Sequence, residues 1–152
     1  MTSESGPMRP FDQSLPMALL RAREAAMRRF RPLLAEHDLT EQQWRVLRAL
    51  TATDGPVEPT VLAERTFLLP PSLSRILSNL EGRGLIERSV ATHDQRRSLI
   101  ELSPDGRMLV RTVAPSSEAA YTRIEQRFGA ARLQHLLEEL HDLAELNLGE
   151  PT

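Results

Sequence analysis

The fold is decided by residues 84–103, which read GLIERSVATHDQRRSLIELS. Two short apolar runs, Leu85–Ile86 and Leu99–Leu102, flank a polar segment in this stretch. The polar segment carries His93, Asp94, Gln95, Arg96 and Arg97. Apolar runs on either side of a polar loop predict two strands joined as a β-hairpin. We therefore expect a hairpin whose loop presents two adjacent arginines.

A helix is predicted immediately before the hairpin, from Pro71 to about Arg83, because Gly84 is a natural stop. Its inward face has apolar residues at helical spacing, namely Leu73, Ile76, Leu77 and Leu80. A shorter helix over residues 59–67 precedes it, with residues 68–70 as the turn. A helix-turn-helix followed by a hairpin is the layout of a winged helix. In that layout the helix fits the DNA major groove, and the hairpin arginines reach phosphates or the minor groove.

Two further helices are predicted on the N-terminal side. Apolar residues recur at helical spacing over Leu15–Leu34, with Ser14 and Pro16 at its start. Pro32 should bend this helix or mark its final turns. Residues 40–43 read TEQQ, a capping-box pattern that opens a second helix. The apolar face of that second helix is Trp44, Leu47 and Leu50.

Two helices are also predicted after the hairpin. Ser103 is a good N-cap for the first of them, with Pro104 at its first position and Pro115 expected to kink it. The second runs over residues 130–147 and carries leucines at positions 133, 136, 137, 140, 143 and 146. The fold class is therefore mainly α with a small β-hairpin wing. We expect the N- and C-terminal helices to pack between two subunits, because helix-turn-helix proteins usually pair. The alternative is that both fold back on their own core.

The composition excludes several classes of function. A chain of 152 residues without cysteine has no disulfide, thiolate zinc site, cysteine nucleophile or thiol redox sensor. No apolar run approaches the ~18 residues of a membrane span. The polar N-terminus lacks the apolar core of a signal peptide. We expect residues 1–13 to be a disordered lead-in, and the protein to be cytoplasmic without a membrane partner.

The charge is distributed unevenly along the chain. The formal net charge of −2 argues at first against a nucleic-acid binder. However, residues 65–97 hold six arginines against three carboxylates, and residues 128–152 hold one arginine against five carboxylates. All 19 basic residues are arginine, which suits bidentate contacts with phosphate and guanine. A GC-rich genome that favours arginine codons explains this usage equally well.

We predict that the helix before the hairpin contacts DNA through Ser72, Ser74, Arg75 and Asn79. Short hydroxyl side chains let the backbone approach DNA and bind phosphate, and Arg75 can read guanine edges. The alternative is ordinary helix capping by Ser72 beside a solvated arginine. The neighbouring arginine-tipped hairpin favours the DNA interpretation.

In the hairpin loop, Asp94 precedes Arg96 by two residues. A carboxylate at this spacing can hold the guanidinium of Arg96 in one geometry and lower the entropy lost on binding. Arg96 would then enter the minor groove, and Arg97 would lie on a phosphate or against the scaffold. The alternative is a solvated charged turn, because an Asp-x-Arg pattern is weak by itself.

Residues 62–107, which read LAERTFLLPPSLSRILSNLEGRGLIERSVATHDQRRSLIELSPDGR, resemble the MarR family of winged-helix regulators. The resemblance extends over nearly the whole chain. Residues 14–17 (SLPM) and 94–97 (DQRR) look most like the regulators of homoprotocatechuate, or aromatic acid, degradation within that family.

The resemblance implies a single domain over residues 14–152, with a winged helix-turn-helix core at about 39–103. Dimerisation helices would cover about 14–36 and 104–148. It also implies a homodimer on a palindromic operator in double-stranded DNA, usually a repressor. Arg88 matches a position that supports the wing.

Family members that sense phenolic compounds bind their effector where the dimer helices meet the winged lobe. The resemblance therefore suggests an effector site for a small phenolic or aromatic carboxylate, with Ser14 and Arg21 for the carboxylate and Trp44 as an aromatic wall. The alternatives are that Trp44 is core and that Arg21 forms a surface or intersubunit ion pair. The four histidines lack metal-ligand spacing, so we predict no metal site and no cofactor. The sequence has no Gly-rich phosphate loop and no nucleophile with a paired base, so we predict no enzyme. A winged-helix module that binds protein without DNA is the alternative function.

Overall fold

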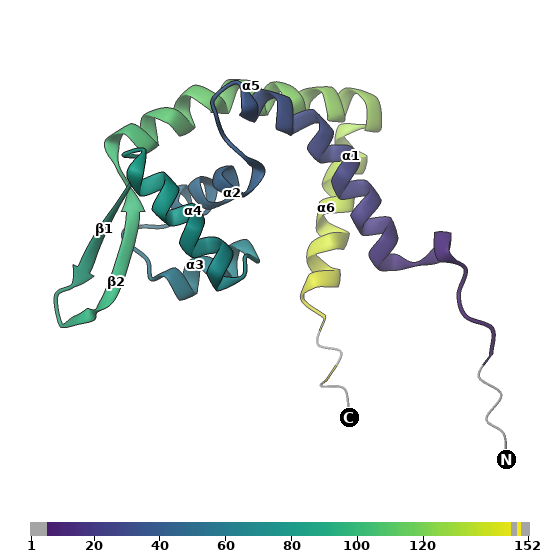
Figure 1. The fold of residues 1–152 in the computed structure, drawn as a ribbon. Helices are drawn as coiled ribbons and strands as arrows, with labels where there is room; N and C mark the ends of the chain where they lie inside the picture. The colour runs from purple at the N-terminus through teal and green to yellow at the C-terminus, as the bar shows by residue number, and fades with distance from the viewer. Residues whose placement is uncertain (1–5, 147–148, 150–152) are drawn as a thin grey trace, which may run out of the picture. The chain divides into compact units, whose positions relative to one another are not determined.

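The computed structural model describes residues 6–146 and 149 (Figure 1). Its elements are η1 (Phe11–Gln13), α1 (Leu15–Ala35), α2 (Glu41–Thr51), α3 (Pro59–Thr66), α4 (Pro70–Gly82), β1 (Ile86–Ala91), β2 (Asp94–Leu102), α5 (Pro104–Phe128) and α6 (Ala130–Ala144). The chain divides into two compact units between Val113 and Ala114, inside α5. The first unit contains η1, α1, the start of α5 and the five elements of the winged-helix region, α2, α3, α4, β1 and β2. The fold is the predicted one, six α-helices with one antiparallel hairpin.

The start of α1 follows the prediction. The Oγ of Ser14 accepts a hydrogen bond from the amide of Met17 at 3.4 Å, and Pro32 lies in the last two turns of the helix. Within the expected lead-in, Phe11–Gln13 forms one 3-10 turn. This turn is closed by a bond of 2.9 Å from the amide of Gln13 to the carbonyl of Pro10. Residues 1–5 lie outside the described part of the chain.

The capping box of α2 is formed as predicted. Thr40 Oγ1 accepts from the Gln43 amide at 3.1 Å, and Gln43 Oε1 accepts from the Thr40 amide at 3.0 Å. The buried residues of this helix are Val46, Leu47 and Leu50, whereas Trp44 is only half-buried. The buried face of α2 therefore includes Val46 in place of the predicted Trp44.

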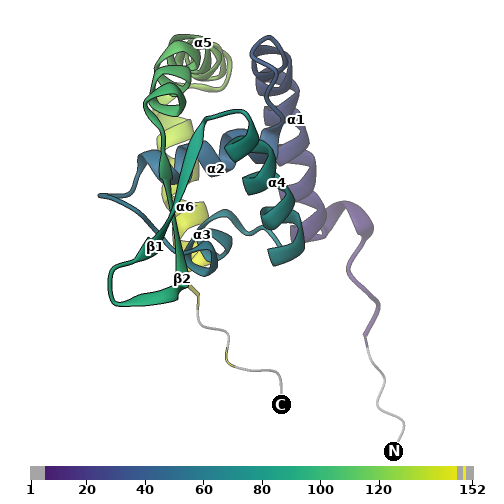
Figure 2. The same cartoon turned by 60° about the vertical axis from the view of Figure 1, so that its left-hand side comes forward.

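The helix-turn-helix consists of α3 and α4, which lie next to the hairpin in Figure 2. Leu73, Leu77 and Leu80 of α4 are buried, so one face of this helix packs on the core. The helix begins at Pro70, one residue earlier than predicted, and Leu69 is its N-cap. No side chain caps it, so the alternative in which Ser72 is a helix cap is wrong.

The hairpin has longer strands than predicted. β1 pairs with β2 from Ile86 opposite Leu102 to Val90 opposite Ser98, and the register then shifts so that Ala91 lies opposite Asp94. The expected polar loop is therefore wrong in extent, because Asp94–Arg97 belong to β2 and only residues 92–93 form the turn. The backbone pairing extends the strands even though their outer halves are exposed on both faces.

The base of the hairpin is held by two neighbouring segments. Val57 and Ile100 exchange backbone hydrogen bonds of 2.9 and 2.8 Å, which adds a one-residue third strand to the sheet. On the other side, Ser103 Oγ donates to the carbonyl of Gly84 at 2.5 Å and accepts from the amide of Gly106 at 3.0 Å. Ser103 is thus the predicted N-cap of α5, and its hydroxyl also joins this helix to the entrance of β1.

The last helix, α6, has no buried residue in the single chain. Leu136 and Leu137 are each 40% exposed, and Leu146 lies beyond the helix. The predicted end of this helix at Asn147 lies outside the described residues. Pro115 lies inside α5, which is continuous from Pro104 to Phe128. Among the described residues, none of the helices is both long enough and apolar enough to cross a bilayer.

Candidate nucleic-acid interface

The outer face of α4 carries polar side chains that bind no other part of the described chain. The burial of Leu73 and Leu77 turns the intervening residues Ser74 and Arg75 outward, and both are exposed. Ser72 is half-buried beside them. Within the described part of the chain, none of these three polar side chains forms a hydrogen bond or ion pair. Their donors and acceptors are therefore available to a ligand outside the chain.

Asn79, further along α4, is engaged within the chain. Its Oδ1 accepts a hydrogen bond of 2.8 Å from Nε2 of Gln43, the same side chain that completes the capping box of α2. After the helix ends, Arg83 donates to the backbone carbonyl of Asp38 at 2.9 Å. Both contacts join the C-terminal half of α4 to the segment around the start of α2, and so fix the orientation of this helix.

In the wing, Asp94 contacts Arg96 differently from the prediction. Asp94 Oδ1 accepts a hydrogen bond of 3.0 Å from the backbone amide of Arg96. Among the described residues, no ion pair joins this carboxylate to the guanidinium of Arg96. The carboxylate instead binds the backbone two residues further on, as in an Asx turn. Asp94 thus shapes the backbone of the wing and leaves the exposed Arg96 side chain unpaired.

The other two wing arginines pair with the scaffold. The guanidinium of Arg97 forms an ion pair with Glu58, the N-cap residue of α3. Arg88 of β1 donates from Nε to Glu81 of α4 at 3.2 Å, and its Nη1 lies 3.5 Å from Oγ of Ser98. One pair holds β2 to α3 and the other holds β1 to α4. The hairpin is therefore tied to both helices of the helix-turn-helix.

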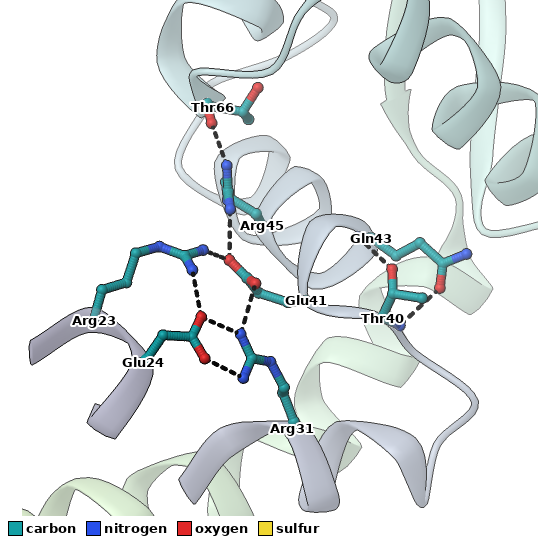
Figure 3. Close-up of polar contacts among 8 residues, drawn as sticks. All are labelled: Arg23, Glu24, Arg31, Thr40, Glu41, Gln43, Arg45 and Thr66. Carbon is teal, nitrogen blue, oxygen red and sulfur yellow. Dashed lines mark hydrogen bonds and ion pairs between the residues drawn. The ribbon is translucent and has the colours of Figure 1, made fainter. Parts of the chain in front are cut away.

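A cluster of charged residues joins α1 to α2 and to the end of α3 (Figure 3). At its centre is Glu41, whose side chain is 12% exposed and which forms ion pairs with Arg23, Arg31 and Arg45. Arg45 also donates to the carbonyl of Thr66, the last residue of α3, at 2.9 Å. We call Arg23, Glu24, Arg31, Glu41 and Arg45 the Glu41 cluster.

The Glu41 cluster was missed by the sequence analysis. The i, i+4 spacing of Glu41 and Arg45 is the one signal of it that the sequence offers. At its exposed edge, Arg31 donates two hydrogen bonds of 2.8 and 2.9 Å to Glu24. The hydrogen bond from Arg31 lowers the pKa of Glu24, and the same bond raises the pKa of Arg31. This edge of the cluster is therefore a salt bridge between two charged groups at neutral pH.

The three predicted effector residues do not share a cavity in the single chain. Ser14 Oγ caps α1, Arg21 is exposed on the same helix, and Trp44 is half-buried in α2. Two surface cavities on the described residues are lined by other side chains, one near the start of α5 and one where α1 leads into α2. Across the described residues, no group of three or more histidine, aspartate or glutamate side chains could hold a metal ion.

Comparison with known proteins identifies the family. A model described as the MarR family matches residues 37–97. The homoprotocatechuate degradative operon repressor of Escherichia coli is 45% identical over 129 residues, which cover 83% of this chain and 86% of the relative.

Solved structures agree with this assignment. NadR in complex with 4-hydroxyphenylacetate has a TM-score of 0.79 at 34% identity, covering 93% of this chain and all of that one. The transcriptional repressor CouR bound to a 23-mer DNA duplex has a TM-score of 0.82 at 26% identity, covering 92% of this chain and all of that one. The hairpin tied to the helix-turn-helix, the polar outer face of α4 and these similarities lead to one assignment. The chain belongs to the MarR family of transcriptional regulators.

Proposed function

We propose that this protein is a homodimeric repressor that binds a palindromic operator and leaves it when a small aromatic acid binds. One observation carries the DNA-binding part of the proposal. The exposed side chains of Ser74 and Arg75 on α4, and of Arg96 on the wing, have no partner in the described part of the chain, whereas neighbouring arginines do. A surface that leaves these groups unpaired suits phosphates and base edges.

Some residues of the interface contact DNA directly, and the others hold them in position. Arg75 reads guanine edges in the major groove, Ser72 and Ser74 bind phosphate, and Arg96 enters the minor groove. The remaining predicted residues position these contacts. Their present partners support this role: Gln43 for Asn79, Glu58 for Arg97, Glu81 for Arg88, and the backbone of Arg96 for Asp94.

The dimer is supported by apolar surface that the single chain leaves uncovered. Leu136 and Leu137 of α6 are each 40% exposed, and Leu15 and Leu20 of α1 are 52% and 50% exposed. Clusters of exposed leucines on helices mark protein interfaces. A two-fold dimer presents two copies of α4, which matches the symmetry of a palindromic operator. Binding to operator DNA also assigns the protein to the cytoplasm.

The effector class is supported by the relatives. A homoprotocatechuate degradative operon repressor is 45% identical, and NadR, 34% identical, binds 4-hydroxyphenylacetate. We infer that Arg21 pairs with the carboxylate, that Ser14 donates a hydrogen bond, and that Trp44 packs on the ring. Arg21 is suited to this role because its exposed guanidinium has no partner among the described residues. Since these residues share no cavity in one chain, the site would be completed by the second subunit.

Fluorescence anisotropy with the DNA upstream of the protein's own gene tests the DNA-binding part. The wild type should prefer this duplex over a scrambled one, and Arg75→Ala should reduce the preference. Each good contact with a base edge contributes about 1–3 kcal/mol of discrimination. Arg111→Ala is the matched control, since it removes the same charge from an exposed site at the start of α5. Equal binding to both duplexes by the wild type would refute the proposal.

Adding 4-hydroxyphenylacetate to the complex tests the effector part. We expect it to release the operator, whereas the uncharged amide of the same acid should not. Arg21→Gln should raise the concentration needed for release, with Arg29→Gln, another exposed arginine of α1, as the matched control. A panel of hydroxy-substituted aromatic acids extends the test. If no member of the panel affects operator binding, the aromatic acid response is wrong while DNA binding stands.

A further inference from the structure

Phe67 combines two properties that are unusual for a phenylalanine. It lies in the turn between α3 and α4 with a φ of 55°, in the left-handed region. Residues with a Cβ rarely adopt this conformation, and glycine adopts it without strain. The side chain is also 92% exposed, so packing within the chain does not compensate for the strain.

The left-handed conformation is imposed by the residues before Phe67. Thr66 is 2% exposed, and its Oγ1 donates a hydrogen bond of 2.6 Å to the carbonyl of Leu62. The carbonyl of Thr66 accepts the bond from Arg45, which is itself held by Glu41. Two hydrogen bonds thus hold Thr66, the last residue of α3, one through its hydroxyl and one through its carbonyl. A strained residue persists where its surroundings determine its conformation in this way.

Asp38 is the other described residue besides glycine with a positive φ, also 55°. Aspartate tolerates this region because its short polar side chain can bond locally. Phe67 ends α3 in a left-handed C-cap, where glycine is usual, and its exposed ring contributes no packing within the chain, which indicates that the ring acts outside it.

The position of Phe67 indicates what covers the ring. It lies three residues before α4 begins, and Leu69, the N-cap of α4, is 74% exposed. These two apolar side chains therefore adjoin the first turns of α4, which carry Ser74 and Arg75. In the major groove, thymine alone presents a methyl group, and apolar side chains including phenylalanine contact it.

We propose that Phe67 and Leu69 contact thymine methyl groups in each half of the operator and so determine part of its sequence preference. This inference rests on the proposed DNA binding. It differs from the proposed contacts of α4 and the wing, because those are polar and these are apolar.

Replacing single thymines of the operator by deoxyuridine tests the inference, since this removes only the 5-methyl group. Burial of one such carbon should make wild-type binding about fourfold tighter with thymine than with deoxyuridine at one or two positions in each half-site. Phe67→Gly should bind the operator at least about tenfold more weakly and should not distinguish thymine from deoxyuridine at those positions. Its Tm should equal or exceed that of the wild type, because the ring packs on nothing and glycine accepts the φ.

Asp38→Gly is the matched control, since it makes the same backbone change at the other left-handed position. It should keep the wild-type response to deoxyuridine. Phe67→Asn, which also tolerates the conformation, serves if the glycine variant folds poorly. Wild-type protein that prefers the operator but ignores every deoxyuridine refutes this inference alone. Wild-type protein without any preference for the operator refutes both this inference and the proposed function.

Discussion

Replacing Gly106 by alanine should destabilise the winged-helix unit, although alanine is the better helix former. Gly106 lies in the first turn of α5, where a Cβ would come within 2.0 Å of the carbonyl oxygen of Leu85 and 3.2 Å of a methyl group of Leu102. Real Cβ contacts below 3.0 Å essentially do not occur, so the helix start must move away by at least 1.0 Å. That movement also strains the hydrogen bond of 3.0 Å from the Gly106 amide to Ser103.

The magnitude follows from opposing contributions. Overpacking costs about 1–3 kcal/mol, and a weakened N-cap costs about 1 kcal/mol. The helix propensity of alanine offsets about 1 kcal/mol of this. We therefore expect a net loss of about 2 kcal/mol, which for a chain of this size lowers Tm by roughly 4–8 °C.

The assay is thermal unfolding followed by circular dichroism, with all proteins at one concentration because dimerisation affects Tm. Gly82→Ala is the matched control. A Cβ at Gly82, the last residue of α4, meets no atom within 4 Å. The same substitution there should leave Tm unchanged or raise it. The reasoning is refuted if Gly106→Ala is as stable as the wild type, or if both variants lose the same stability.

Three further predictions concern charged groups. Arg96→Ala should reduce the slope of log affinity against log salt by about one for each subunit that contacts DNA, measured by anisotropy over a range of salt. Glu41→Gln should lower the free energy of unfolding in urea by about 1–2 kcal/mol, since it leaves Arg45 without a carboxylate and leaves Arg23 and Arg31 with Glu24 alone, although the partial exposure of these arginines limits the loss. The lowered pKa of Glu24 means that its salt bridge with Arg31 stabilises the fold above pH 4.5, the ordinary pKa, and is lost as the pH falls through the lowered value. The difference in Tm between wild type and Glu24→Gln should therefore be constant near neutral pH and shrink in acid; a difference that grows in acid would contradict this.

Local signals predicted most of the helices. The caps at Ser14, Thr40 and Ser103 depend on residues three positions away at most, so the sequence alone reveals them. The leucines of α4 repeat at helical spacing, and they are buried as predicted at positions 73, 77 and 80. These elements were predictable because each contains its own start signal and its own apolar period.

Features that depend on distant segments were not predictable. Asp94–Arg97 read as a loop because four polar residues carry no strand pattern; in β2 they contain a register shift, and Asp94 pairs with Ala91 of β1. The bridge from Val57 to Ile100 is a single residue pair, which is too short to show the alternating apolar pattern of a strand. The Glu41 cluster brings together charges that are 18 residues apart in the chain, from Arg23 to Glu41, and only the packing of α1 on α2 reveals it.

The hydroxyl of Ser103 has a mechanical consequence. It bonds at once to the carbonyl of Gly84, where the hairpin begins, and to the first turn of α5. Next to it, the backbone of Leu85 lies against Gly106 with no room for even a methyl group. Moving the start of α5 relative to the base of the wing therefore breaks or strains these contacts. A displacement of the first turn of α5 would therefore be passed to Gly84 and Leu85, where the hairpin begins.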